Sequence, residues 1–79
     1  MKLIKFEKQN CPACTMVENF LSDQGVETKK INPFDNPDLA AQYEIGSVPV
    51  TILLNEEGTE VERSIGFKPH ELERIISKL

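Results

Sequence analysis

Asn10-Cys11-Pro12-Ala13-Cys14 holds both cysteines of the 79-residue chain, at the spacing C-x-x-C. The stretch follows a short apolar run that is typical of a strand, and it precedes an amphipathic run that is typical of a helix. A C-x-x-C motif at such a junction indicates a dithiol/disulfide redox centre. Because a bridge between these cysteines would close only a very small loop, it would not staple the fold. We therefore expect the role of the pair to be chemical.

The start of a helix is a favourable place for a reactive thiol. Unpaired backbone N–H groups and the positive end of the helix dipole lie there, and both favour a thiolate. The thiolate is the species that attacks a disulfide. Cys14 follows Cys11 by about one helical turn, within reach of the mixed disulfide that Cys11 forms. We predict that Cys11 is the nucleophile and Cys14 the resolving thiol, with Pro12 at the first helical position.

Composition limits the classes of function. The length allows one small domain, residues 1–79, and 39% hydrophobic and 28% charged residues are ordinary for a globular domain. A net charge of −4 disfavours nucleic acid and anionic membranes as partners. No run is long enough to span a membrane, and the charged first residues do not resemble a signal peptide. We expect a cytoplasmic monomer, in a compartment where a C-x-x-C is catalytic, redox-sensing or metal-binding.

Periodicity and turn residues predict the order strand-helix-strand-helix-strand-strand-helix. We expect strands at residues 3–6, 26–31, 50–54 and 59–65, and helices at residues 12–24, 37–44 and 69–78. The almost wholly apolar run 50–54 is typical of a central strand buried on both faces. The run 59–65 alternates, with Val61, Arg63 and Ile65 on one face, as in a half-exposed strand. Gly46 is expected to end the second helix.

This order predicts an α/β fold with one four-stranded mixed sheet and three helices on its two faces. The first three strands are expected to be parallel, joined by right-handed crossovers. A hairpin at residues 55–58, with Gly58 at positive φ, makes the fourth strand antiparallel. Ligands of open α/β sheets bind beyond the carboxyl ends of strands, and Cys11 follows such an end.

The whole chain resembles the thioredoxin superfamily, in its compact glutaredoxin-like form. Cys11-Pro12-Ala13-Cys14 is close to the C-P-x-C motif of glutaredoxins, and Val48-Pro49 resembles the X-cis-Pro element that faces the active cysteines in this superfamily. The resemblance implies a thioredoxin-like βαβαββα fold in which Pro49 is cis. It also implies that the extended backbone at Val48 pairs with a substrate peptide by strand addition.

The segment Ser64-Ile65-Gly66-Phe67-Lys68-Pro69 looks like the S-G-F-R-P signature of NrdH-type redoxins, with an inserted isoleucine and lysine for arginine. Those redoxins take electrons from thioredoxin reductase and pass them to ribonucleotide reductase. The glutathione-binding residues of glutaredoxins are replaced here by Asn55-Glu56-Glu57-Gly58. The resemblance implies a protein-disulfide oxidoreductase without a bound cofactor, which receives electrons from NADPH through a separate reductase. A glutathione-dependent glutaredoxin is the alternative.

We expect these residues to contact a partner: Lys8, Pro12, Ala13, Val48, Pro49, Gly66 and Phe67. The Lys8 cation could stabilise the nearby thiolate or attract an anionic partner. Alternatively, Lys8 is an ordinary solvated loop residue. Phe67 is expected either to dock a partner or to pack. Phe34 is expected to pack in the ordinary way.

Lys5 stands where thioredoxins carry a buried aspartate that accepts the proton of the resolving thiol. A lysine in the middle of a strand is costly unless its amine reaches water or a partner. We expect its stem to cover a helix and its amine to reach water, and tuning of the cysteines is the alternative.

Two further classes use the same motif or fold: a C-x-x-C metal-binding module and a redox-inactive binding module. Zinc normally takes four ligands, and the only histidine, His70, is expected to be exposed on the last helix. We predict no metal site. The presence of both cysteines and of Pro49 argues against a redox-inactive module.

Overall fold

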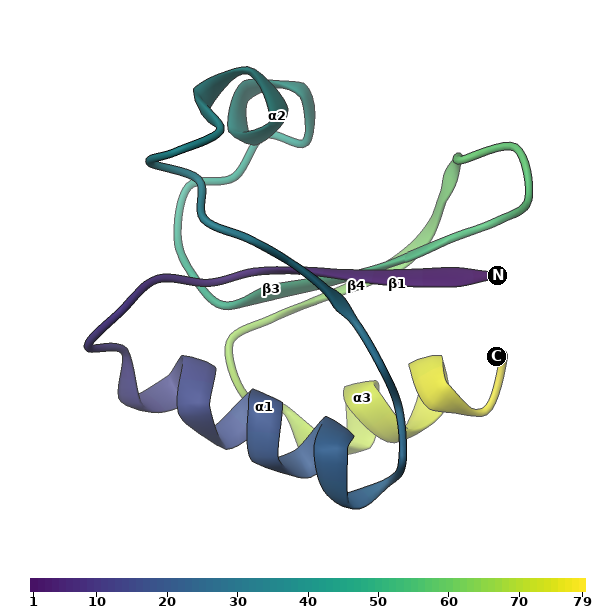
Figure 1. Ribbon diagram of the computed structural model, residues 1–79. Coiled ribbons are helices and arrows are strands. Elements are labelled where there is room, and N and C mark those ends of the chain that lie inside the picture. The colour runs from purple at the N-terminus through teal and green to yellow at the C-terminus, as the bar shows by residue number, and fades with distance from the viewer.

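The computed structural model describes all 79 residues as a four-stranded sheet with three helices (Figure 1). The elements in chain order are β1 (Lys2–Phe6), α1 (Pro12–Asp23), β2 (Lys29–Ile31), α2 (Pro37–Gln42), β3 (Val50–Leu54), β4 (Glu60–Ile65) and α3 (Pro69–Ile76). The predicted order is confirmed. Helices α1 and α3 lie on one face of the sheet and α2 lies on the other. None of the helices has the length and hydropathy needed to cross a membrane.

The strand order is β2-β1-β3-β4, so β1 and β3 are the central strands. β1 is parallel to β2 but antiparallel to β3, with Phe6 opposite Val50 and Lys2 opposite Leu54. The prediction that the first three strands are parallel is therefore wrong for β3. A parallel β3 would need a connection that returns along the full length of the sheet. Instead, β2 ends at Ile31 and β3 begins at Val50, both opposite Phe6, so the connection that holds α2 leaves and re-enters the sheet at the same end.

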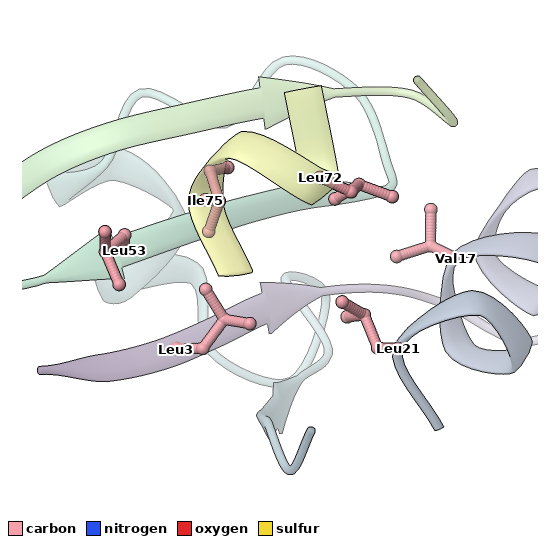
Figure 2. Close-up of a cluster of buried hydrophobic side chains, with 6 residues drawn as sticks. All are labelled: Leu3, Val17, Leu21, Leu53, Leu72 and Ile75. Carbon is pink, nitrogen blue, oxygen red and sulfur yellow. The ribbon is translucent and has the colours of Figure 1, made fainter. Parts of the chain in front are cut away.

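The two central strands divide the core into two layers. On the face covered by α1 and α3, the buried cluster consists of Leu3, Val17, Leu21, Leu53, Leu72 and Ile75 (Figure 2). On the α2 face, the buried cluster consists of Ile4, Phe6, Ile31, Val50, Ile52 and Leu54. Every residue of β3 is buried, which confirms the prediction of a strand covered on both faces. The cysteine-bearing helix α1 is thus fixed to the sheet along its apolar side.

The edge strand β4 is half exposed, as predicted, but its apolar residues do not enter the core. Val61 and Ile65 are 42% and 47% exposed. Ser64 is buried instead and donates a hydrogen bond to Glu71 Oε1 at 2.7 Å. Ile65 pairs with Val50 and so lies on the α2 face. Helix α2 is short and does not extend over this edge strand, so Val61 and Ile65 remain exposed to solvent.

Two element ends differ from the expectation. Helix α2 ends at Gln42, and the left-handed residue after it is Glu44, at φ 55°, rather than Gly46. The backbone N–H of Ile45 closes this end by donating to the carbonyl of Ala40 at 2.8 Å. Strand β2 has three residues instead of six, because it pairs with β1 only at its carboxyl end. The predicted hairpin turn is confirmed, with Gly58 at φ 80°.

Candidate active site

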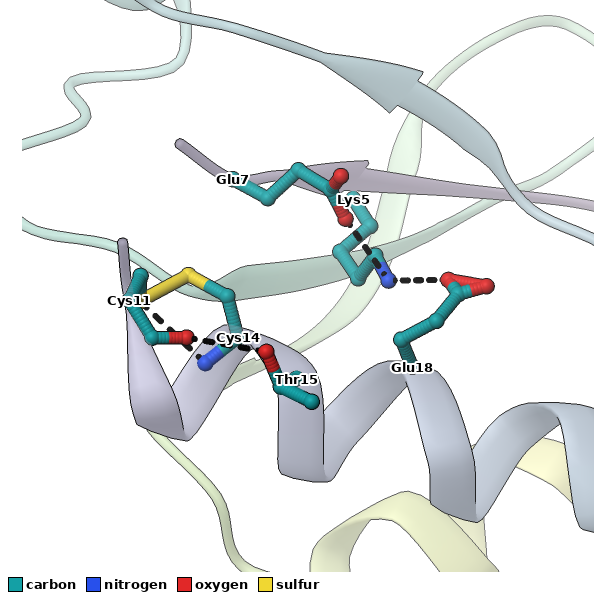
Figure 3. Close-up of a disulfide and its surroundings, with 6 residues drawn as sticks. All are labelled: Lys5, Glu7, Cys11, Cys14, Thr15 and Glu18. Carbon is teal, nitrogen blue, oxygen red and sulfur yellow. Dashed lines mark hydrogen bonds and ion pairs between the residues drawn. A yellow bond between two sulfur atoms is a disulfide. The ribbon is translucent and has the colours of Figure 1, made fainter. Parts of the chain in front are cut away.

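Cys11 and Cys14 lie at the amino end of α1, just after β1, and are joined by a disulfide (Figure 3). Their Cα atoms are 5.2 Å apart. Cys11 is the N-cap residue, with extended backbone, and Pro12 takes the first helical position as predicted. The backbone N–H of Cys14 donates to Cys11 Sγ at 3.2 Å. One of the free donors of the helix start is therefore directed at the sulfur that is expected to carry negative charge.

The two sulfur-bearing residues differ in their access to solvent. Cys11 is half-buried on the loop side of the helix, whereas Cys14 is only 4% exposed and faces the core. A partner disulfide can therefore approach Cys11 but not Cys14. This asymmetry is what a pair with one attacking and one resolving thiol requires.

The predicted X-Pro element is present at the same end of the sheet. The Val48–Pro49 peptide bond is cis, the geometry that the resemblance implies. The backbone N–H of Gly66 donates to the carbonyl of Pro49 at 2.8 Å, which joins the entry of β3 to the exit of β4. Gly66 has φ 83°, a left-handed conformation that glycine adopts without strain. Residues far apart in sequence are thereby held together.

A pocket of about 580 Å³ lies between this loop and the start of α2. Lys8 and Val48 line it, together with Ile45 and Phe34. Phe34 is 77% exposed. The expectation that Phe34 packs in the ordinary way is therefore wrong, because the turn held by its N–H bond to Asn32 Oδ1 (2.9 Å) presents the ring outward.

The other predicted partner-contacting residues lie outside this pocket. Phe67 is half-buried and packs edge-on against Phe20 of α1, with ring centroids 6.2 Å apart. Pro12 is exposed and Ala13 is half-buried in the first turn of α1. The structure thus brings Lys8 and Val48 to one surface and directs Phe67 toward the helix layer.

No cluster of three or more histidine, cysteine or acidic residues has the arrangement of a metal site. His70 is fully exposed at the start of α3, and its Nδ1 lies 3.4 Å from Glu73 Oε1 on the same helix. One imidazole and one carboxylate are fewer than the four ligands that a structural zinc site takes.

Lys5 is completely buried, at 0% exposure, although it lies in the middle of β1. Its Nζ is 2.6 Å from Glu18 Oε2 and 2.8 Å from Glu7 Oε1 (Figure 3). The expectation that the amine reaches water is wrong, because α1 covers it and supplies a carboxylate. Two carboxylates offset the large cost of desolvating an ammonium group.

Two spacings in the sequence are consistent with this cluster of charged residues. Glu7 follows Lys5 by two residues, the spacing that places side chains on one side of a strand. Glu18 follows Cys14 by four residues, which places both on one side of α1. Neither spacing shows by itself that the strand and the helix bring these groups together.

The hydrogen bond from Lys5 lowers the pKa of Glu18, partial burial opposes this effect, and Lys30 lowers the pKa further. The Nζ of Lys30, on β2, is 3.1 Å from Glu18 Oε1. Glu18 therefore stays ionised throughout the neutral range. The carboxylate joins β1, β2 and α1 in a single charged network.

Comparison with known proteins places these features in context, although no family model matches the chain. The chain is 43% identical over 79 residues to the SPbeta prophage-derived thioredoxin-like protein YosR of Bacillus subtilis, covering 100% of this chain and 99% of the relative. It is 31% identical over 85 residues to a thioredoxin of Staphylococcus epidermidis, covering 99% and 81%. The crystal structure of thioredoxin NaTrxh from Nicotiana alata superposes with a TM-score of 0.83 at 31% identity, covering 96% and 70%.

Replacing Glu18 by glutamine should lower the free energy of unfolding by about 1–2 kcal/mol at pH 7. This is less than the roughly 3–5 kcal/mol for breaking a buried ion pair, because Glu7 still pairs with Lys5 and the Glu18 side chain is 36% exposed. The folded state lowers the pKa of Glu18 from 4.5. Its contribution is therefore present above that value and is lost as the pH falls through the folded pKa. Urea unfolding at pH 7 and pH 3 measures both effects.

Glu27→Gln, which removes an exposed carboxylate, is the matched control and should change stability by less than about 0.5 kcal/mol. Lys5→Met should cost less than Glu18→Gln, because an apolar side chain of similar size needs no partner in the interior. An equal loss for Glu18→Gln at both pH values would contradict the ion-pair account.

Proposed function

The chain belongs to the thioredoxin superfamily and is a thiol–disulfide oxidoreductase, and on this premise we propose that it reduces disulfide bonds in other proteins through Cys11 and Cys14. The observation that carries the proposal is the disulfide at the amino end of α1, with Cys11 accessible and Cys14 only 4% exposed. A structural bridge across so small a loop would stabilise the fold very little.

The reaction consists of two thiol–disulfide exchanges. In the first, the Cys11 thiolate attacks one sulfur of the partner disulfide, and the other partner sulfur leaves with the bonding electron pair. The N–H of Cys14, 3.2 Å from Cys11 Sγ, and the helix end stabilise the attacking thiolate. In the second, Cys14 attacks Cys11 Sγ, and the second partner sulfur leaves as a thiolate. The partner gains two electrons and the chain is left with the Cys11–Cys14 disulfide.

The chain binds no cofactor in this proposal, and a separate reductase that uses NADPH restores the dithiol in the cytoplasm. Similarity to thioredoxins over nearly the whole chain supports thioredoxin reductase as the electron donor. The hairpin Asn55-Glu56-Glu57-Gly58, in place of the glutathione-binding residues of glutaredoxins, supports the same choice. The redoxin-like segment 64–69 makes ribonucleotide reductase one candidate acceptor.

The partner peptide is proposed to lie along the backbone at Val48, in the manner of an added strand. The pocket lined by Val48, Phe34 and Lys8 then takes a side chain that neighbours the partner cysteine. Its apolar walls favour an apolar side chain, and the ammonium group of Lys8 favours an acidic residue beside it. Partner segments of this composition are the expected substrates.

The reductant is identified by following NADPH consumption with the oxidised chain and insulin as the final disulfide. One reaction contains thioredoxin reductase, and a second contains glutathione with glutathione reductase. We expect turnover with thioredoxin reductase and little with glutathione. Turnover with glutathione alone would identify a glutaredoxin and contradict the proposed donor, and turnover with neither would contradict the proposed function.

Phe34→Ala should raise the KM for insulin about three- to tenfold, since burial of a Phe side chain is worth roughly 1.5–3 kcal/mol and the ring is only partly covered by a partner. The rate with a small aromatic disulfide should not change, because such a substrate does not fill the pocket. Val61→Ala, which truncates an exposed apolar residue on β4, is the matched control. Equal KM values for the two variants would show that the pocket does not contact the partner.

A further inference from the structure

A small polar cavity of about 140 Å³ joins Cys14 to the ion-pair network of Lys5. Its walls are formed by Glu7, Lys8, Cys14, Thr15 and Glu18. In Figure 3, the carboxylates and the Lys5 amine lie between β1 and α1, on the side of the helix where Cys14 is found. The volume is ample for water, which needs a polar site with partners for its hydrogen bonds.

The second exchange step requires a proton acceptor near Cys14. As a thiol, Cys14 must lose its proton before its sulfur can attack Cys11 Sγ. At 4% exposure, its sulfur has little access to hydroxide or buffer in bulk solvent. A base for this step must lie within hydrogen-bond reach, directly or through one water molecule. The cavity supplies that route.

The charged groups around the cavity differ in their capacity to accept a proton. The lysine side chains at and beside the cavity, Lys5, Lys8 and Lys30, are hydrogen-bond donors rather than acceptors. Both oxygens of Glu18 are engaged, one by Lys5 at 2.6 Å and the other by Lys30 at 3.1 Å. Glu7 makes one ion pair, through Oε1 at 2.8 Å from Lys5 Nζ, whereas Glu18 makes two. Glu7 is also 29% exposed, so a proton taken up there can pass on to solvent.

We propose that Glu7 accepts the proton of the Cys14 thiol through one water molecule in the cavity, and that Lys5 is the positioning residue that holds Glu7 there. The inference rests on the proposed function. The proton moves from Cys14 Sγ to the water, and a proton of the water moves to Glu7. The Cys14–Cys11 sulfur bond forms as the bond from Cys11 Sγ to the partner breaks, and the partner leaves as a thiolate.

This assignment gives the buried Lys5 a role in orienting Glu7. A free Glu7 side chain at the end of β1 would sample many rotamers, and fixing a long side chain costs up to about 2 kcal/mol. The ion pair with Lys5 restricts the Glu7 side chain, which lines the cavity beside Cys14. Glu18 holds Lys5 from α1, so the helix that carries Cys14 and the strand that leads into Glu7 keep a fixed separation.

The two exchange steps can be timed separately with the reduced chain and the aromatic disulfide DTNB. Attack by Cys11 releases the first coloured thiolate, and resolution by Cys14 releases the second, so stopped-flow absorbance records two phases. Glu7→Gln should leave the first rate unchanged and slow the second about a hundredfold at pH 7, the lower end of general-base contributions. Its second rate should rise with hydroxide, about tenfold per pH unit between pH 6 and 8. Glu7→Asp should restore part of the loss.

Lys5→Met should slow the second phase less than Glu7→Gln and leave the first unchanged. Glu27→Gln is the control for loss of a carboxylate and should match the wild type in both phases. A larger loss in Glu18→Gln than in Glu7→Gln, or equal slowing of both phases in Glu7→Gln, would overturn the assignment to Glu7. If Glu7→Gln does not fold, the Lys5→Met, Glu7→Gln double variant is compared with Lys5→Met in the same way.

The outcomes separate this inference from the proposed function. A wild-type chain that shows both phases, with an unchanged second phase in Glu7→Gln, would refute the role of Glu7 and leave the function intact. A wild-type chain that releases only one thiolate would contradict the two-step mechanism itself.

Discussion

The ion pairs of Lys5 with Glu7 and Glu18 connect the centre of the sheet to the helix that carries the cysteines. The amine is fully buried, so both carboxylates have to remain beside it; an unpaired buried charge would cost several kcal/mol. This requirement fixes α1 against β1 at the level of Glu18, one turn after Cys14. The inward sulfur is held beside a polar cavity, and Cys11 is left at the surface where a partner can reach it.

The direction of β3 is the second constraint on the site. Because β3 is antiparallel to β1, its first residue, Val50, lies opposite Phe6, at the end of β1 that leads to Cys11. The cis Val48–Pro49 element therefore enters the sheet at the same end as the cysteines. A parallel β3 would have placed it at the opposite end, away from the chemistry. The antiparallel direction of β3, which the sequence pattern did not predict, therefore brings the cis-proline element and the cysteines to one end of the sheet.

Local sequence was sufficient where neighbouring residues determine the structure. The motif at the start of α1, the burial of β3 and the left-handed turn at Gly58 all follow from residue type and short-range spacing. It was insufficient where distant elements meet. Lys5 finds Glu18 thirteen residues away, and the exposure of Ile65 depends on how far the short α2 extends across the sheet. In both cases the burial of the side chain is decided by tertiary packing rather than by local propensity.

The most direct test of the account is whether a covalent complex accumulates when only the resolving thiol is removed. Reduced Cys14→Ser and Cys11→Ser variants are mixed with insulin and analysed by mass spectrometry without reductant. The account predicts a mixed disulfide between Cys11 and insulin in the Cys14→Ser variant and no adduct in Cys11→Ser. An adduct in Cys11→Ser, or disulfide reduction by that variant at the wild-type rate, would contradict the assigned roles of the two cysteines.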